Sequence, residues 1–83
     1  MSDSEIMAQV AEIIRRTFRQ PTAPITRDTQ ALDIDGWDSL SHTNLILEVE
    51  KQFDVRLPAD EVFDLADVGE LVDLVAKVVK ARR

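Results

Sequence analysis

The sequence predicts an all-α fold, a four-helix bundle with three longer helices, one short helix and a long loop between the first and second. The main observation is that apolar residues recur at intervals of three and four in three separate stretches. That spacing places them on one face of a helix. A second observation is that no stretch alternates apolar and polar residues as a half-buried strand does. Amphipathic helices bury their apolar faces against one another, so a bundle follows.

The first helix is predicted over residues 3–19. Ser2 and Glu5 have the spacing of a capping box, and three arginines lie in the last turn, where the helix dipole favours cations. The apolar face consists of Ile6, Val10, Ile13, Ile14 and Phe18. Two prolines follow, and residues 20–37 lack helical periodicity, so this segment is predicted to be a long loop.

Three further helices are predicted over residues 39–53, 59–64 and 68–81. Asp38 and Asp67 are placed to cap the two longer ones. Their apolar faces contain Leu45, Ile46, Val49 and Phe53 in one, and Val68, Leu71, Val72, Val75, Val78 and Val79 in the other. The last helix is rich in valine, but its apolar residues follow the helical period and not every second position.

The composition indicates a single acidic domain. The chain has 83 residues, of which 45% are hydrophobic and 31% charged, with no cysteine and a formal net charge of −6. Residues 1–83 are therefore expected to form one domain that depends on its apolar core, since disulfides and thiolate metal sites are excluded. Between Asp28 and Asp73 the only Lys or Arg residues are Lys51 and Arg56. This acidic field repels nucleic acid and anionic membranes and attracts basic protein patches, although acidity kept for solubility alone remains the alternative.

Residues 1–5 are not followed by a long apolar run. That pattern predicts neither a signal peptide nor a membrane-inserted segment. We therefore expect a cytoplasmic protein, and we expect it to be a monomer.

One segment places a serine in the first turn of a predicted helix, directly after a loop that contains a glycine. Its sequence is Asp35-Gly36-Trp37-Asp38-Ser39-Leu40-Ser41-His42. A hydroxyl at that position is exposed, and the unpaired N–H groups of the helix end favour an attached phosphate. Ser39 can thus accept a phosphodiester without burying charge. From the residues alone, a simple capping role for Asp38-Ser39 remains open.

The neighbouring segments carry a resemblance. The helix after Ser39 ends in Glu48-Val49-Glu50-Lys51-Gln52-Phe53, and Val55-Arg56-Leu57-Pro58 comes next. Together with Asp38-Ser39-Leu40, the loop glycine and Asp67-Val68, these segments resemble the acyl carrier protein family from about Leu32 through Leu74. The resemblance points to a free-standing, specialised member of that family.

The resemblance implies that Ser39 is the attachment point of a covalent 4′-phosphopantetheine arm, with Asp38 and Leu40 completing the motif. A phosphopantetheinyl transferase would place the arm there from coenzyme A, which makes the chain a phosphoprotein. The terminal thiol of the arm would then hold an acyl group as a thioester. Partner enzymes for loading and transfer supply the catalysis, so the chain itself is expected to be a non-catalytic carrier.

The resemblance also implies a partner surface on the second helix. Its expected contacts are Leu40, Thr43, Leu47, Glu48 and Glu50. Ser41 and Asn44 stand where carriers of fatty acid synthesis usually have carboxylates, and Lys51 adds a positive charge. These departures argue against the central fatty acid pathway, although fatty acid synthesis stays among the possible pathways. Trp37 before the aspartate resembles carriers of polyketide, nonribosomal peptide or other specialised pathways.

The acyl group is expected between the second and third helices, as in the family. The corresponding lining residues are His42, Ile46, Val49, Leu57, Val62 and Leu65. Because His42 would put a polar ring near the mouth of this pocket, a short or polar acyl group is predicted. Trp37 is expected to pack over the loop as an apolar lid.

Several alternatives remain open from the residues. Ser39 and His42 could form part of an enzyme, but the chain lacks a G-x-S-x-G elbow and a second histidine. A calcium loop with Gly36 at its sixth position would put Ala31 first and His42 last, where carboxylates are needed, so no metal site is expected. Two further alternatives to an acyl carrier are a peptidyl or aminoacyl carrier and a cofactor-free helical interaction module.

Overall fold

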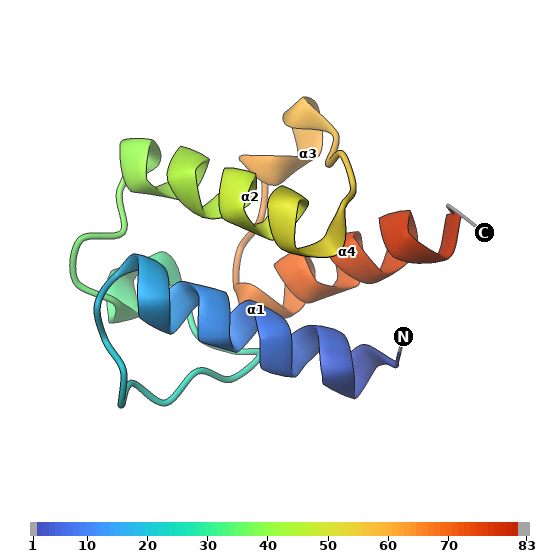
Figure 1. Cartoon of the computed structure of the whole chain (residues 1–83). Coiled ribbons are helices and arrows are strands. Elements are labelled where there is room, and N and C mark those ends of the chain that lie inside the picture. Colours follow the sequence, from blue (N-terminus) through green and yellow to red (C-terminus); the bar gives the residue numbers. More distant parts are fainter. Residues whose placement is uncertain (1, 82–83) are drawn as a thin grey trace.

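The computed structural model describes residues 2–81, and that part of the chain contains helices and no strand. The elements in chain order are α1 (Asp3–Thr17), the 3₁₀ turn η1 (Ala31–Asp33), α2 (Ser39–Phe53), α3 (Ala59–Val62) and α4 (Val68–Ala81). Helix α1 packs against both α2 and α4, and the short α3 is part of the segment that connects α2 to α4 (Figure 1). The predicted all-α four-helix fold with a long first loop is therefore confirmed.

Helix α1 begins as the sequence predicts and ends earlier. The Ser2 hydroxyl accepts the Glu5 N–H at 3.2 Å, and the Glu5 carboxylate accepts the Ser2 N–H at 3.1 Å, which completes the capping box. At the other end, Arg19 has a left-handed backbone with φ of 55°, and the Gln20 N–H bonds the Arg15 carbonyl at 2.8 Å. This C-terminal motif ends the helix at Thr17, whereas the sequence prediction had placed its end at residue 19.

Helix α3 is also shorter than predicted. It was expected over residues 59–64 and ends at Val62, with Phe63 as its C-cap. The Asp64 N–H turns back to the Glu61 carbonyl at 3.1 Å, an i to i−3 bond that tightens the chain and does not continue the α-helix. The carbonyl of Val62 is thereby left for another partner.

The loop over residues 18–38 is anchored by its own polar groups. Thr29 is buried, and its hydroxyl accepts the Thr26 N–H at 2.9 Å. The carbonyls of Thr29 and Arg27 accept the N–H groups of Val68 (2.9 Å) and Gly69 (2.8 Å) in the first turn of α4. These bonds satisfy donors that a helix end otherwise leaves unpaired. They hold the loop across the start of α4.

The apolar core joins α1, α2 and α4. Its largest fully buried side chains are Ile6, Val10, Ile13, Ile14, Leu45, Val49, Val68, Leu71, Val72 and Val75, all from the predicted apolar faces. The loop adds Ile25 and Ile34, which no helical pattern marks. Among the described helices none is both long and apolar enough to cross a membrane.

Candidate functional site

The start of α2 presents Ser39 to solvent. Asp38 has an extended backbone and caps the helix, since its carboxylate accepts the Ser41 N–H at 2.9 Å. Ser39 is the first helical residue and is exposed. The Thr43 hydroxyl donates to the Ser39 carbonyl at 3.2 Å, one turn further along. The backbone of Ser39 is thus held by the helix while its side chain stands at the surface.

Asp38 is held in its charged form by the helix that it caps. The hydrogen bond from the Ser41 backbone N–H, followed by a smaller contribution from the Ser41 side chain, lowers the pKa of Asp38 below its usual value. A carboxylate near a helix N-terminus is also favoured by the helix dipole. The cap is therefore strongest when Asp38 is ionised.

We expect the folding stability to fall in acid through Asp38. Because the pKa of Asp38 is lowered in the folded state, its contribution is complete above the unfolded value, about 3.9. It is lost as the pH falls through the lower folded pKa. Asp38→Asn keeps a capping side chain but cannot titrate, so its melting temperature should fall less below about pH 4. Thermal unfolding between about pH 2 and pH 7 measures this, and superimposable pH profiles would contradict it.

The loop before Ser39 turns at a glycine. Gly36 has φ of 86°, a left-handed conformation that residues with a Cβ rarely adopt. No atom lies within 4 Å of the position that a Cβ would take there, so the backbone conformation and not lack of space calls for glycine. This turn brings Trp37 against the bundle and leaves Asp38 free to cap α2.

Four rings form a stack beside the serine. Trp37 lies against Phe18 with ring centroids 5.1 Å apart and an interplanar angle of 23°. On its other side it lies against His42, at 6.0 Å and 18°. His42 in turn meets Phe63 at 5.4 Å with the rings tilted by 57°. The stack thus connects the end of α1, the loop, α2 and the end of α3.

Two hydrogen bonds run through the same residues. The Trp37 indole N–H donates to Nδ1 of His42 at 3.0 Å, and Nε2 of His42 lies 2.6 Å from the Val62 carbonyl oxygen. An indole nitrogen only donates, so Nδ1 must be the acceptor. The proton of the neutral imidazole is therefore on Nε2 and is donated to Val62. His42 links Trp37 to the last carbonyl of α3.

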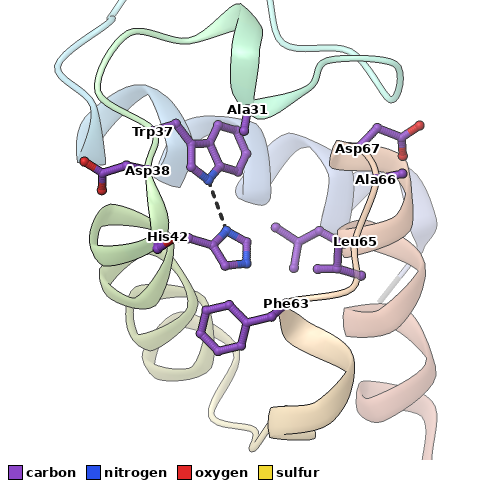
Figure 2. A pocket seen from close by; sticks show the side chains of 10 residues that line it. Ala31, Trp37, Asp38, His42, Phe63, Leu65, Ala66 and Asp67 are labelled. Atoms are coloured by element: carbon purple, nitrogen blue, oxygen red, sulfur yellow. Dashed lines mark hydrogen bonds between the residues drawn. The ribbon is translucent and has the colours of Figure 1, made fainter.

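A cavity of about 330 Å³ opens beside these rings. Figure 2 shows Trp37, His42 and Phe63 along one side of it and Leu65 opposite them. The complete lining is Ala31, Trp37, Asp38, Ser39, His42, Phe63, Leu65, Ala66, Asp67 and Leu71. Ser39 therefore stands at a cavity with a mainly apolar wall.

The expected partner residues on α2 fall into two groups. Leu40 and Leu47 are 75% and 58% exposed, and Thr43 and Glu48 are exposed as well. Glu50 is half-buried, and its carboxylate accepts the Leu57 N–H at 2.7 Å. This bond fixes the turn after α2. It is not predictable from the sequence, because no local pattern pairs these two residues.

The expected pocket residues are also divided. Four of them, Ile46, Val49, Leu57 and Val62, are buried in the core. The other two, His42 and Leu65, line the surface cavity. The structure adds Phe63 to the cavity wall, although it is 61% exposed. The only signal for it in the sequence is an aromatic residue near the end of the predicted short helix.

The site suits a phosphodiester-linked arm. An exposed hydroxyl can take a charged phosphodiester without the desolvation that burial would impose. The adjoining cavity offers an apolar wall for whatever the arm carries. Within residues 2–81, no three His, Asp or Glu side chains gather closely enough to hold a metal ion.

Comparison with known proteins agrees with this geometry. Residues 8–75 match the family described as "Phosphopantetheine attachment site". The acyl carrier protein of Acidothermus cellulolyticus is 37% identical over 76 residues, covering 92% of this chain and 90% of that protein. The acyl carrier protein of Beutenbergia cavernae is 36% identical over 75 residues, covering 90% of this chain and 92% of that protein.

A solved structure is similar over the same range. The solution NMR structure of holo acyl carrier protein from Geobacter metallireducens matches with a TM-score of 0.83 and 38% sequence identity. The match covers 92% of this chain and 87% of that one. Acyl carrier proteins are generally non-catalytic. The chain belongs to the acyl carrier protein family and carries acyl groups on a covalently attached 4′-phosphopantetheine.

Proposed function

We propose that Ser39 carries the phosphopantetheine arm and that residues 1–83 act as one carrier domain, non-catalytic and cytoplasmic. The observation that supports this best is the position of Ser39. It is the exposed first residue of α2, lines the cavity, and lies within the residues that match the attachment-site family. Once attached, the arm holds an acyl group as a thioester and partner enzymes do the chemistry on it.

The residues around Ser39 have defined roles in this proposal. Asp38 caps α2 through the Ser41 N–H and so fixes where the serine hydroxyl stands. Leu40, directly after Ser39 in the chain, has an apolar side chain that is 75% exposed. An exposed leucine beside a modification site offers an incoming transferase a contact that excludes water.

The exposed strip of α2 is the proposed partner surface. It consists of Leu40, Thr43, Leu47 and Glu48, and it would be met by the phosphopantetheinyl transferase and by acyl-loading and acyl-transfer enzymes with basic patches. A carboxylate oxygen of Glu48 lies 4.0 Å from a guanidinium nitrogen of Arg16, so part of the charge of Glu48 is compensated within the chain. Glu50 is assigned a structural role, because its carboxylate bonds the Leu57 N–H. A weaker negative field suits a specialised pathway, since steering by opposite charge is reduced.

Intact mass tests the attachment site. The arm-free protein is incubated with coenzyme A and a promiscuous phosphopantetheinyl transferase. We expect a gain of one phosphopantetheine unit in the wild type and none in Ser39→Ala. Ser41→Ala is the matched control, because it removes a hydroxyl from the same helical turn and should still gain the full mass.

The controls separate a lost site from a lost fold. Circular dichroism should show the same helix content in all three proteins, since neither serine side chain is part of the core. A folded, arm-free wild type that gains no mass would overturn the proposal and favour a cofactor-free interaction module. A gain retained in Ser39→Ala would place the arm on another residue.

A further inference from the structure

The face of α2 that leads from Ser39 into the core passes through His42. Ser39, His42, Ile46 and Val49 are spaced by three, four and three residues, so they follow one face of the helix. Ser39 is exposed, His42 is half-buried, and Ile46 and Val49 are buried. A chain tethered to Ser39 that moved along this face into the core would meet the imidazole first.

His42 is held in place from both sides. It accepts the Trp37 indole N–H at 3.0 Å and donates to the Val62 carbonyl, 2.6 Å away. Val62 is the last residue of the one-turn helix α3, and its side chain is buried. A helix this short is not stable by itself, so its position against α2 depends on such contacts.

Opening a path between α2 and α3 would break this arrangement. Moving His42 aside removes the donor from the Val62 carbonyl and the acceptor from the Trp37 N–H. Polar groups left without partners in a partly buried place are costly. It would also separate the His42 ring from Trp37 and Phe63. The buried side chains behind it would then have to part as well.

The cavity outside this barrier is open and small. Its volume of about 330 Å³ is near the lower end of the range for small-molecule sites, about 300–1,000 Å³. Its wall includes the rings of Trp37, His42 and Phe63, together with Leu65 and Leu71. Ser39 lines the same cavity, so a group tethered to this residue can reach it without passing His42.

We propose that His42 is a specificity-determining residue that closes the core between α2 and α3, so that this carrier takes a short acyl group into the cavity beside Trp37, His42 and Phe63. The inference rests on the proposed attachment of the arm to Ser39. It goes further by naming the residue that limits the cargo and the place where the cargo lies. A long apolar chain stays outside the core and gains no shielding from it.

Loaded proteins test this inference directly. Wild type, His42→Leu and Asn44→Leu are loaded from coenzyme A analogues that carry a butanoyl or a decanoyl group through an amide, and loading is checked by mass. Methyl resonances of Ile46 and Val49 report the core, those of Leu65 report the cavity, and the single indole N–H, that of Trp37, reports the ring stack. Asn44 is an exposed residue of the same helix that makes no part of the cavity wall, so its variant is the matched control.

In wild type and Asn44→Leu we expect both acyl groups to shift Leu65 and the indole N–H while Ile46 and Val49 stay unchanged. In His42→Leu we expect the decanoyl group to shift Ile46 and Val49 strongly. The corresponding decanoyl thioester should then be cleaved severalfold more slowly by hydroxylamine than in wild type. Trp37→Phe is the substitute variant if His42→Leu does not fold. It keeps an aromatic ring but removes the hydrogen-bond donor to His42. With this variant we expect the decanoyl group to shift Ile46 and Val49 in the same direction but by less.

Two outcomes overturn the inference. One is a decanoyl group that shifts Ile46 and Val49 in the wild type as strongly as in His42→Leu. The other is a core that stays unperturbed in every folded variant, because His42 would then not be what excludes the chain. Failure of the underlying attachment is recognised separately, since no mass is gained at the loading step.

Discussion

Leu45→Ala is expected to remove most of the stability of this domain. Leu45 is fully buried, with 0% exposure, on the face of α2 that enters the core. Truncating a buried leucine to alanine costs about 2–5 kcal/mol, because transfer free energy is lost and a cavity remains. A core in a domain of this size rarely supplies more than about 3–5 kcal/mol in total. Much of the variant should therefore be unfolded at 25 °C.

Leu47→Ala is the matched control for this experiment. Leu47 lies two residues further along the same helix and is 58% exposed, so the same substitution should change the free energy of unfolding by no more than about 0.5 kcal/mol. Urea denaturation followed by circular dichroism compares the two variants. Equal losses in both would show that the core is not where the structure places it. Leu47→Ala should also react more slowly with a partner enzyme while remaining folded.

Trp37→Ala is the second substitution with a large expected effect. The indole lies between Phe18 and His42, and its N–H is the donor to Nδ1 of His42. Replacing a buried aromatic residue with alanine costs about 3–5 kcal/mol, and the half-buried Trp37 should fall near the lower value, about 3 kcal/mol. The loss should be visible both in denaturation midpoints and in the amide resonances of Val62 and Phe63.

Trp37→Phe separates the ring from its hydrogen bond. A phenyl ring can still pack on Phe18, but His42 loses its donor, so a cost of about 1 kcal/mol is expected. The order of stability should be wild type, then Trp37→Phe, then Trp37→Ala. A Trp37→Ala protein as stable as the wild type would mean that the four-ring stack does not hold the loop against the bundle.

The observed helix bounds show which helix ends can be predicted from neighbouring residues alone. Helix α2 begins directly after Asp38 and α4 after Asp67, whose carboxylate accepts the Glu70 N–H at 2.9 Å. Both are local caps that can be identified from residue type and spacing. The end of α1 could not be identified in this way, because an arginine adopts the left-handed conformation that glycine usually supplies.

The residues of the candidate site differ in the same way, since some can be identified from their neighbours in the chain and others cannot. Ser39 could be singled out because its neighbours in the chain, a loop glycine and a capping aspartate, define its position at a helix start. The role of Glu50 could not, since its partner Leu57 is brought close only by the turn after α2. His42 was expected at a pocket mouth, but its bonds to Trp37 and to the Val62 carbonyl depend on how α3 packs.

The sequence by itself determined the helical class, the start of each longer helix, the apolar face of each and the exposed serine, because periodicity and capping act over neighbouring residues. Only the tertiary structure decided that Phe18, Trp37, His42 and Phe63 stack in one row and that a cavity opens beside Ser39. These contacts join α1, the loop, α2 and the end of α3. Their geometry depends on packing between segments far apart in the chain, which local periodicity does not encode.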